Sequence, residues 1–147
     1  MDMETLTNDI LNILRDPGQS PLVEAVIRRL DSFGYKAAVS DSWLIAFSLQ
    51  KTRSHILNQI NHQEIPDGLR EIAVDMICGE ILGTKLSTGQ LELEALDLEA
   101  VVESIEEGDA KVVFSDTDSD TAKAEALIGW LREGKGCDFS CFRRMRW

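Results

Sequence analysis

Residues 65–86 read IPDGLREIAVDMICGEILGTKL, and this stretch decides the fold. Its apolar residues recur three and four positions apart, which is the repeat of an amphipathic helix. The ring of Pro66 does not fit inside a helix and disfavours helical backbone at Ile65. The sequence therefore predicts a central helical segment over 65–83. Its apolar stripe comprises Leu69, Ile72, Ala73, Met76, Ile77 and Ile81, and three polar residues lie outside the stripe, namely Arg70, Glu71 and Asp75.

Two helices are predicted at the start of the chain, and together they resemble a helical hairpin. The first ends at Asp16-Pro17-Gly18, because proline and glycine stop a helix. The second begins at Ser20 and Pro21, which suit a cap and a first turn, and Gly34 ends it. The apolar positions of the first are Leu6, Ile10, Ile13 and Leu14, and those of the second are Leu22, Val26, Leu30 and Phe33.

A third helix is predicted between the capping cluster Ser40-Asp41-Ser42 and Asn61-His62, which completes an N-terminal helical region over 1–62. Its apolar positions are Trp43, Ala46, Phe47, Ile56, Leu57 and Ile60. A last helix is predicted from about residue 120 to residue 133, where glycines follow it. Residues 120–147 thus comprise this helix and a basic, aromatic tail.

The repeat changes to every second residue between 101 and 115. Val101, Glu103 and Ile105 alternate with their neighbours, and Glu107-Gly108-Asp109 is a short glycine-containing turn. This pattern favours a β-hairpin over 101–115, although a helix over Leu98–Glu107 is the alternative. We therefore expect a mainly α fold, a bundle of about five helices with one β-hairpin insertion, within a single domain over 1–147.

Composition fits one soluble domain made in the cytosol. The chain has 147 residues, of which 44% are hydrophobic, so a core can form. No apolar run approaches the roughly 20 residues of a membrane span, and the polar N-terminus lacks the features of a signal peptide. Three cysteines in such a chain are expected to be free thiols, namely Cys78, Cys137 and Cys141.

The net charge of −11 is concentrated in one part of the chain. Between Leu86 and Asp120 there are eleven acidic residues and one basic residue, Lys111, whereas the tail from Arg132 to Trp147 is basic. Such asymmetry suggests two surfaces of opposite sign, although a run of charge is equally often a solvated face. An acidic surface repels nucleic acid.

None of the candidate sites for metal binding or catalysis matches a known motif. Residues 116–120 resemble the start of a calcium loop, but Thr121 and Leu127 stand where that loop needs Gly and Glu. His55 and His62 lack neighbouring metal ligands. The sequence also lacks a phosphate-binding loop and a recognisable nucleophile motif. We therefore expect no enzymatic activity, no cofactor and no metal.

The tail is the better functional candidate. It combines arginines with aromatic side chains, and Arg and Trp are enriched at the centres of protein interfaces. The interpretations are docking to a partner protein, packing of Phe139, Phe142 and Trp147 against the last helix, and binding of nucleic acid, which the acidic remainder of the chain weakens.

Three blocks then carry a resemblance to a known family. They are IPDGLREIAVDMICGEIL (65–82), VVESIEEGDAKVVF (101–114) and ALIGWLREGKGCDFSCFRRMRW (126–147). In this order they resemble the head–tail connector proteins of tailed bacteriophages and prophages. The resemblance covers roughly the second half of the chain, and the first half is similar only in its helical character. Cys137 and Cys141 are not features of that family.

The resemblance implies a structural protein of the virion head–tail junction, synthesised and assembled in the bacterial cytoplasm. Such proteins form a ring, typically of twelve subunits, that binds the portal protein and presents a platform to a stopper or tail-completion protein. The ring extends the channel through which DNA passes without specific binding, and no membrane is involved. The alternative is a small DNA-binding or regulatory protein that uses the arginine-rich tail.

Two groups of residues are assigned roles on this hypothesis. The first would line the channel or contact a neighbouring subunit from the hairpin: Glu103, Glu106, Glu107 and Asp109. The second would bind the portal or another partner from the tail: Phe142, Arg143, Arg144, Arg146 and Trp147.

Overall fold

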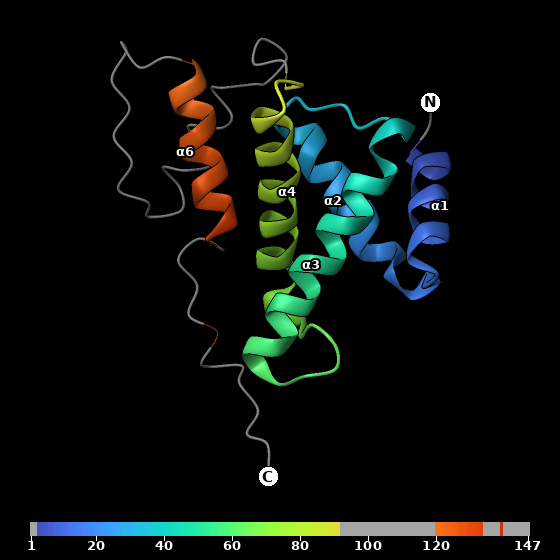
Figure 1. Ribbon diagram of the computed structural model, residues 1–147. Helices are drawn as coiled ribbons and strands as arrows, with labels where there is room; N and C mark the ends of the chain where they lie inside the picture. The colour runs from blue at the N-terminus through green and yellow to red at the C-terminus, as the bar shows by residue number, and fades with distance from the viewer. Residues whose placement is uncertain (1–2, 92–119, 134–138, 140–147) are drawn as a thin grey trace.

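The chain folds into five α-helices in the part that its structure, a computed structural model, describes, namely residues 3–91, 120–133 and 139 (Figure 1). The predicted mainly helical class is thereby confirmed. No strand occurs within these described ranges, and the predicted β-hairpin over 101–115 lies outside them. The helices are α1 (Met3–Leu14), α2 (Ser20–Ser32), α3 (Ser42–Ile60), α4 (Arg70–Ser87) and α6 (Asp120–Arg132), and short 3₁₀ turns occupy Pro17–Gln19, Val39–Asp41 and Asp67–Leu69.

Helix α4 is the centre of the bundle. It packs against α2, α3 and α6, whereas α1 packs on the far side against α2 and α3 (Figure 1). Side chains from all five helices form one large hydrophobic core. A second, smaller cluster joins the end of α3 to the start of α4, and it comprises Ile56, Ile60, Leu69, Ala73 and Met76.

The helix boundaries follow most of the local signals in the sequence, but the predicted cap at Ser20 is wrong, because Ser20 is the first residue of α2 and no side chain caps that helix. The Asp16 carboxylate accepts a hydrogen bond from the Gly18 N–H at 3.0 Å and so caps the turn that leads into α2. Asn61 adopts the left-handed conformation that ends α3, with φ at 57°. Pro66 is extended, so the chain can turn into α4 only after it.

Helix α4 begins later and ends one turn later than the predicted segment 65–83. The extra turn is stabilised by contacts that apolar periodicity does not reveal. Leu86 packs against the main core, and Lys85 forms an ion pair with Asp41. The helix ends at Ser87, and Gly89 follows with a φ of +72°, which suits a residue without a side chain.

Helices α4 and α6 run antiparallel and approach each other closely at two glycines of α4 (Figure 1). A Cβ atom on Gly79 would lie 2.9 Å from both the backbone N of Arg132 and the Cβ of Leu131. A Cβ atom on Gly83 would meet the guanidinium of Arg132. The four-residue spacing places both glycines on one face of α4, so that face is where α6 docks. Glu80, between them in sequence, pairs with Lys51 of α3 at 3.1 Å and with Arg132 at 3.5 Å.

Candidate functional site

The nine residues to which the sequence assigns roles lie outside the described part of the chain. They are Glu103, Glu106, Glu107 and Asp109 of the acidic segment, and Phe142, Arg143, Arg144, Arg146 and Trp147 of the tail. The structure does describe where these two parts of the chain attach to the bundle. It also describes two features on the surface of the bundle.

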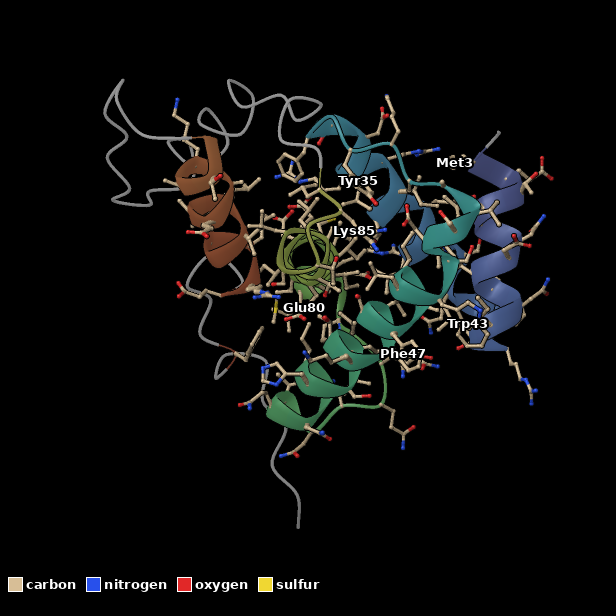
Figure 2. The ribbon with its side chains drawn as sticks, turned by 45° about the horizontal axis from the view of Figure 1, so that its top comes forward. Met3, Tyr35, Trp43, Phe47, Glu80 and Lys85 are labelled. Carbon is tan, nitrogen blue, oxygen red and sulfur yellow. The ribbon has the colours of Figure 1, made fainter. Side chains whose placement is uncertain are left out.

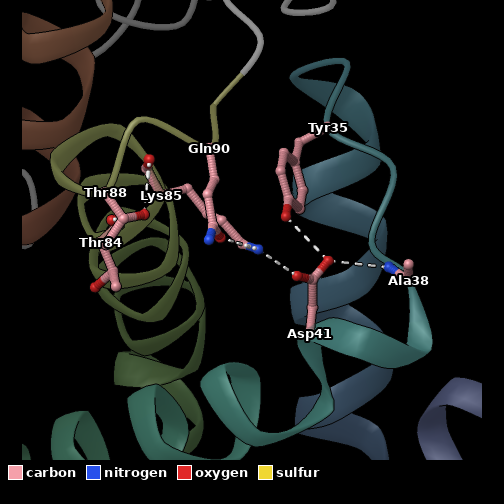
Figure 3. A network of polar contacts seen from close by, with 7 residues as sticks. All are labelled: Tyr35, Ala38, Asp41, Thr84, Lys85, Thr88 and Gln90. Atoms are coloured by element: carbon pink, nitrogen blue, oxygen red, sulfur yellow. Dashed lines mark hydrogen bonds and ion pairs between the residues drawn. The ribbon is translucent and has the colours of Figure 1, made fainter.

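A buried polar cluster holds the end of α4 from which residues 92–119 depart (Figure 3). The Asp41 carboxylate forms an ion pair with Lys85 at 2.7 Å, and its side chain is only 4% exposed. It also accepts hydrogen bonds from the Tyr35 hydroxyl at 2.9 Å and from the Ala38 N–H at 3.1 Å. Lys85 in turn donates to the Gln90 side chain at 3.1 Å. The cluster therefore ties α4 to the loop between α2 and α3.

The ionisation of this cluster is set by its geometry. Burial alone would raise the pKa of the Asp41 carboxyl, but the hydrogen bonds from Lys85, Ala38 and Tyr35, together with the charge of Lys85, hold that pKa below its ordinary value. Burial and the hydrogen bond to Asp41 raise the pKa of the Tyr35 hydroxyl well above its usual range, so this hydroxyl remains a donor. Asp41 and Lys85 are therefore both charged, and each has hydrogen-bond or ion-pair partners within the cluster.

The tail attaches at the opposite end of the bundle. Phe139 packs against the small cluster between α3 and α4, next to residues such as Ile56 and Leu69. Phe142 and Trp147, the other aromatic residues of the packing interpretation, lie outside the described residues. Since α6 begins beside the end of α4 and runs back along it, the acidic segment and the basic tail leave from opposite ends (Figure 1).

Two aromatic side chains stand exposed on α3 (Figure 2). Trp43 is 63% exposed and Phe47 is 64% exposed, and their ring centroids lie 6.2 Å apart. The sequence predicted both at apolar positions of this helix, but its buried face is formed instead by Ile45, Ala46, Leu49, Ile56 and Ile60. One turn of helix separates the pair, so they form a single apolar surface that the bundle leaves open to solvent.

A groove of about 560 Å³ lies between α2 and α4 and is lined by three arginines. Arg29 pairs with Asp75 at 2.9 Å and lies over the Phe33 ring, 4.6 Å from its centroid. The placement of Asp75 away from the buried stripe was wrong, because this residue is only 3% exposed. The other arginines of the groove are Arg28 and Arg70, which form no ion pair with any described residue.

The cysteine that the structure describes is buried and chemically quiet. Cys78 lies in α4, and its thiol donates a weak hydrogen bond to the Val26 carbonyl at 3.7 Å. Burial, together with the nearby charge of Asp75, raises the pKa of this thiol far above its usual range, so it stays protonated. Cys137 and Cys141 lie outside the described residues.

Within residues 3–91, 120–133 and 139, no group of three or more His, Cys, Asp or Glu side chains is placed to hold a metal ion. None of the helices described is both long enough and apolar enough to cross a bilayer. Comparison of the chain with family models, curated proteins and solved structures gives no match.

Proposed function

We propose that this chain is the subunit of a head–tail connector ring, which sits beneath the portal of a bacteriophage head, extends the DNA channel and joins the head to the tail. The three sequence blocks in family order support the proposal, and so does the mainly helical bundle. On this proposal the tail residues Phe142–Trp147 contact the portal, and the acidic segment borders the channel or a neighbouring subunit.

The observation that carries the proposal is the exposed aromatic pair on α3. Two large aromatic side chains, each more than 60% exposed, are unusual on a subunit that works alone. Aromatic residues are also enriched where protein partners bind most tightly. The pair sits on a well-packed helix, so it is presented in a fixed position. These properties fit a lateral contact between ring subunits.

The arrangement of the two bundle ends also supports an assembling subunit. The acidic segment leaves beside the end of α4, and the tail leaves near the cluster between α3 and α4. The two attachment points lie at opposite ends of the bundle, which gives each subunit a direction. A ring between two unlike partners, the portal above and a tail component below, requires subunits with such a direction.

The proposal is tested by binding of the purified chain to DNA-filled heads that carry a portal but lack a tail, from the phage or prophage that encodes the chain. Negative-stain imaging should reveal a new ring of density at one vertex. Absence of binding would contradict the connector proposal. If the chain instead binds free DNA with a strong salt dependence, the regulatory alternative replaces it.

The double variant Trp43→Gln/Phe47→Gln is expected to reduce decoration of these heads at least tenfold, because the lateral contact loses its aromatic centre. Its free energy of unfolding should change by less than about 1 kcal/mol, since both side chains are exposed in the single chain. Titration of heads with labelled protein measures the first quantity, and urea unfolding measures the second.

The matched control is His55→Gln/Asn58→Gln, which alters two exposed positions on the same helix. It should decorate heads as the unaltered chain does. Equal decoration by the aromatic variant and the control would show that the pair on α3 plays no part in assembly.

A further inference from the structure

We infer that the arginine-lined groove between α2 and α4 binds the acidic segment, residues 92–119, of a second copy of the chain. The inference rests on the proposed ring and names the contact that joins one subunit to the next.

The groove is lined by three arginines and by the carboxylates of Glu71 and Asp75, and two of the arginines form no ion pair with a described residue. Arg28 projects from α2 and Arg70 from the start of α4, both are exposed, and neither pairs with a carboxylate in the described part of the chain. Arg29 lies between them but is engaged by Asp75 and Phe33, so it is held in place. Guanidinium groups bind carboxylates through paired hydrogen bonds, which makes such a groove selective for acidic side chains.

The segment provides the complementary charge. Residues 92–119 contain ten acidic residues and one lysine, a net charge of −9 out of the −11 carried by the whole chain. Oppositely charged surfaces attract and orient each other during encounter, and the rest of the chain carries a net charge of only −2. The arginines of the groove therefore complement the charge of the segment.

The choice of a neighbouring copy rests on the proposed ring, and the positions of the groove and of the segment's attachment point are compatible with it. The residues that α4 contributes to the groove lie between Arg70 and Asp75, whereas the segment departs beyond Ser87. The twelve residues of helix from Asp75 to Ser87 span about 18 Å. A donor patch at one end and an acceptor groove toward the other make a head-to-tail contact, and such contacts repeated around an axis close into a ring.

The experiment uses a fluorescently labelled peptide of residues 92–119, titrated with the full-length chain and followed by anisotropy. The expected result is saturable binding that weakens as salt rises, because the contact is between charges. Arg28→Glu/Arg70→Glu should weaken binding at least tenfold. The control Arg15→Glu/Lys123→Glu makes the same change in net charge outside the groove and should retain binding within twofold to threefold. Equal affinity for the two variants, or absence of binding to the unaltered chain, would overturn the inference.

Two further arms exclude other occupants. In the first, Glu103→Gln, Glu106→Gln, Glu107→Gln and Asp109→Asn are combined in the full chain. If a chain's own segment fills its groove, this variant will bind the peptide at least tenfold more tightly than the unaltered chain even at a concentration at which the unaltered chain is monomeric by analytical ultracentrifugation, and that result would overturn the assignment to a second copy. In the second arm, duplex DNA competes with the labelled peptide. Displacement by DNA at a lower concentration than by unlabelled peptide would reassign the groove to nucleic acid.

Failure of this inference is distinguishable from failure of the proposed function. If the unaltered chain decorates heads but the peptide does not bind, the connector proposal stands and the groove assignment falls. If the peptide binds through Arg28 and Arg70 but heads are not decorated, the groove is a contact between copies and the connector proposal falls.

Discussion

Lys85→Met is expected to lower the free energy of unfolding by about 3 kcal/mol at pH 7, because it leaves the buried Asp41 carboxylate without its counter-charge. The Lys85 side chain is 16% exposed and that of Asp41 is 4% exposed, so water cannot replace the lost partner. Tyr35 and the Ala38 N–H would remain as donors, and they keep the effect below that of a fully isolated charge. Urea unfolding at neutral pH measures the loss.

The same pair gives a pH dependence with a definite sign. The folded pKa of Asp41 lies below its ordinary value, so its contribution to stability is present above the unfolded pKa of about 3.9 and is lost as pH falls through the folded pKa. In the Lys85→Met chain this contribution is missing. The difference in stability between the two chains should therefore be largest above about pH 5 and should shrink as pH falls below about 4.

The control is Lys51→Met, which removes the lysine of an exposed pair with Glu80. The Lys51 side chain is 72% exposed, and such surface pairs contribute less than about 1 kcal/mol. If Lys85→Met destabilises the chain no more than Lys51→Met does, the Asp41 cluster does not fix the end of α4.

The second large effect is expected at Gly79. Gly79→Ala should lower the free energy of unfolding by about 2 kcal/mol, because the added Cβ lies too close to the backbone of Arg132 and to Leu131. The two helices must then separate, which outweighs the gain of about 1 kcal/mol that alanine brings to a helix. Urea unfolding of the full chain measures this change.

Two other glycines provide matched controls for the same substitution. Gly83→Ala meets only the end of the Arg132 side chain, which can move, so its effect should stay within about 1 kcal/mol. Gly129→Ala, on α6, meets nothing within 4 Å and should stabilise the chain by up to about 1 kcal/mol. Equal effects at all three positions would show that α6 does not dock closely on Gly79.

The helices could be predicted because their signals are local. Apolar periodicity, Pro66 and the stop at Asp16-Pro17-Gly18 each act within a few residues, and these signals predict all five helices. The end of α4 could not be predicted, because it depends on the contact of Lys85 with Asp41, which is distant in sequence.

The surfaces were harder to predict because they depend on partners that are far away in the chain. Asp75 is buried only because Arg29, 46 residues earlier, neutralises it. Trp43 and Phe47 are residue types that usually occur in a core. Only the packing of α3 shows that they lie outside its buried face. The spacing of Gly79 and Gly83 was the one available signal for the docking of α6, and it was missed.

Because other helices enclose α4, amide hydrogens in α4 and in α6 are expected to exchange through two different unfolding events. Its residues 73–79 are all buried, and α2, α3 and α6 surround them, so their amide hydrogens should exchange only when the whole bundle unfolds. Helix α6 packs chiefly on α4 and can detach while α1–α4 keep their mutual contacts, so its amides should exchange through a less costly local event. During such an event the face of α4 that carries Gly79 and Gly83 is exposed to solvent. A helix from a neighbouring molecule then has room to bind this face in place of α6.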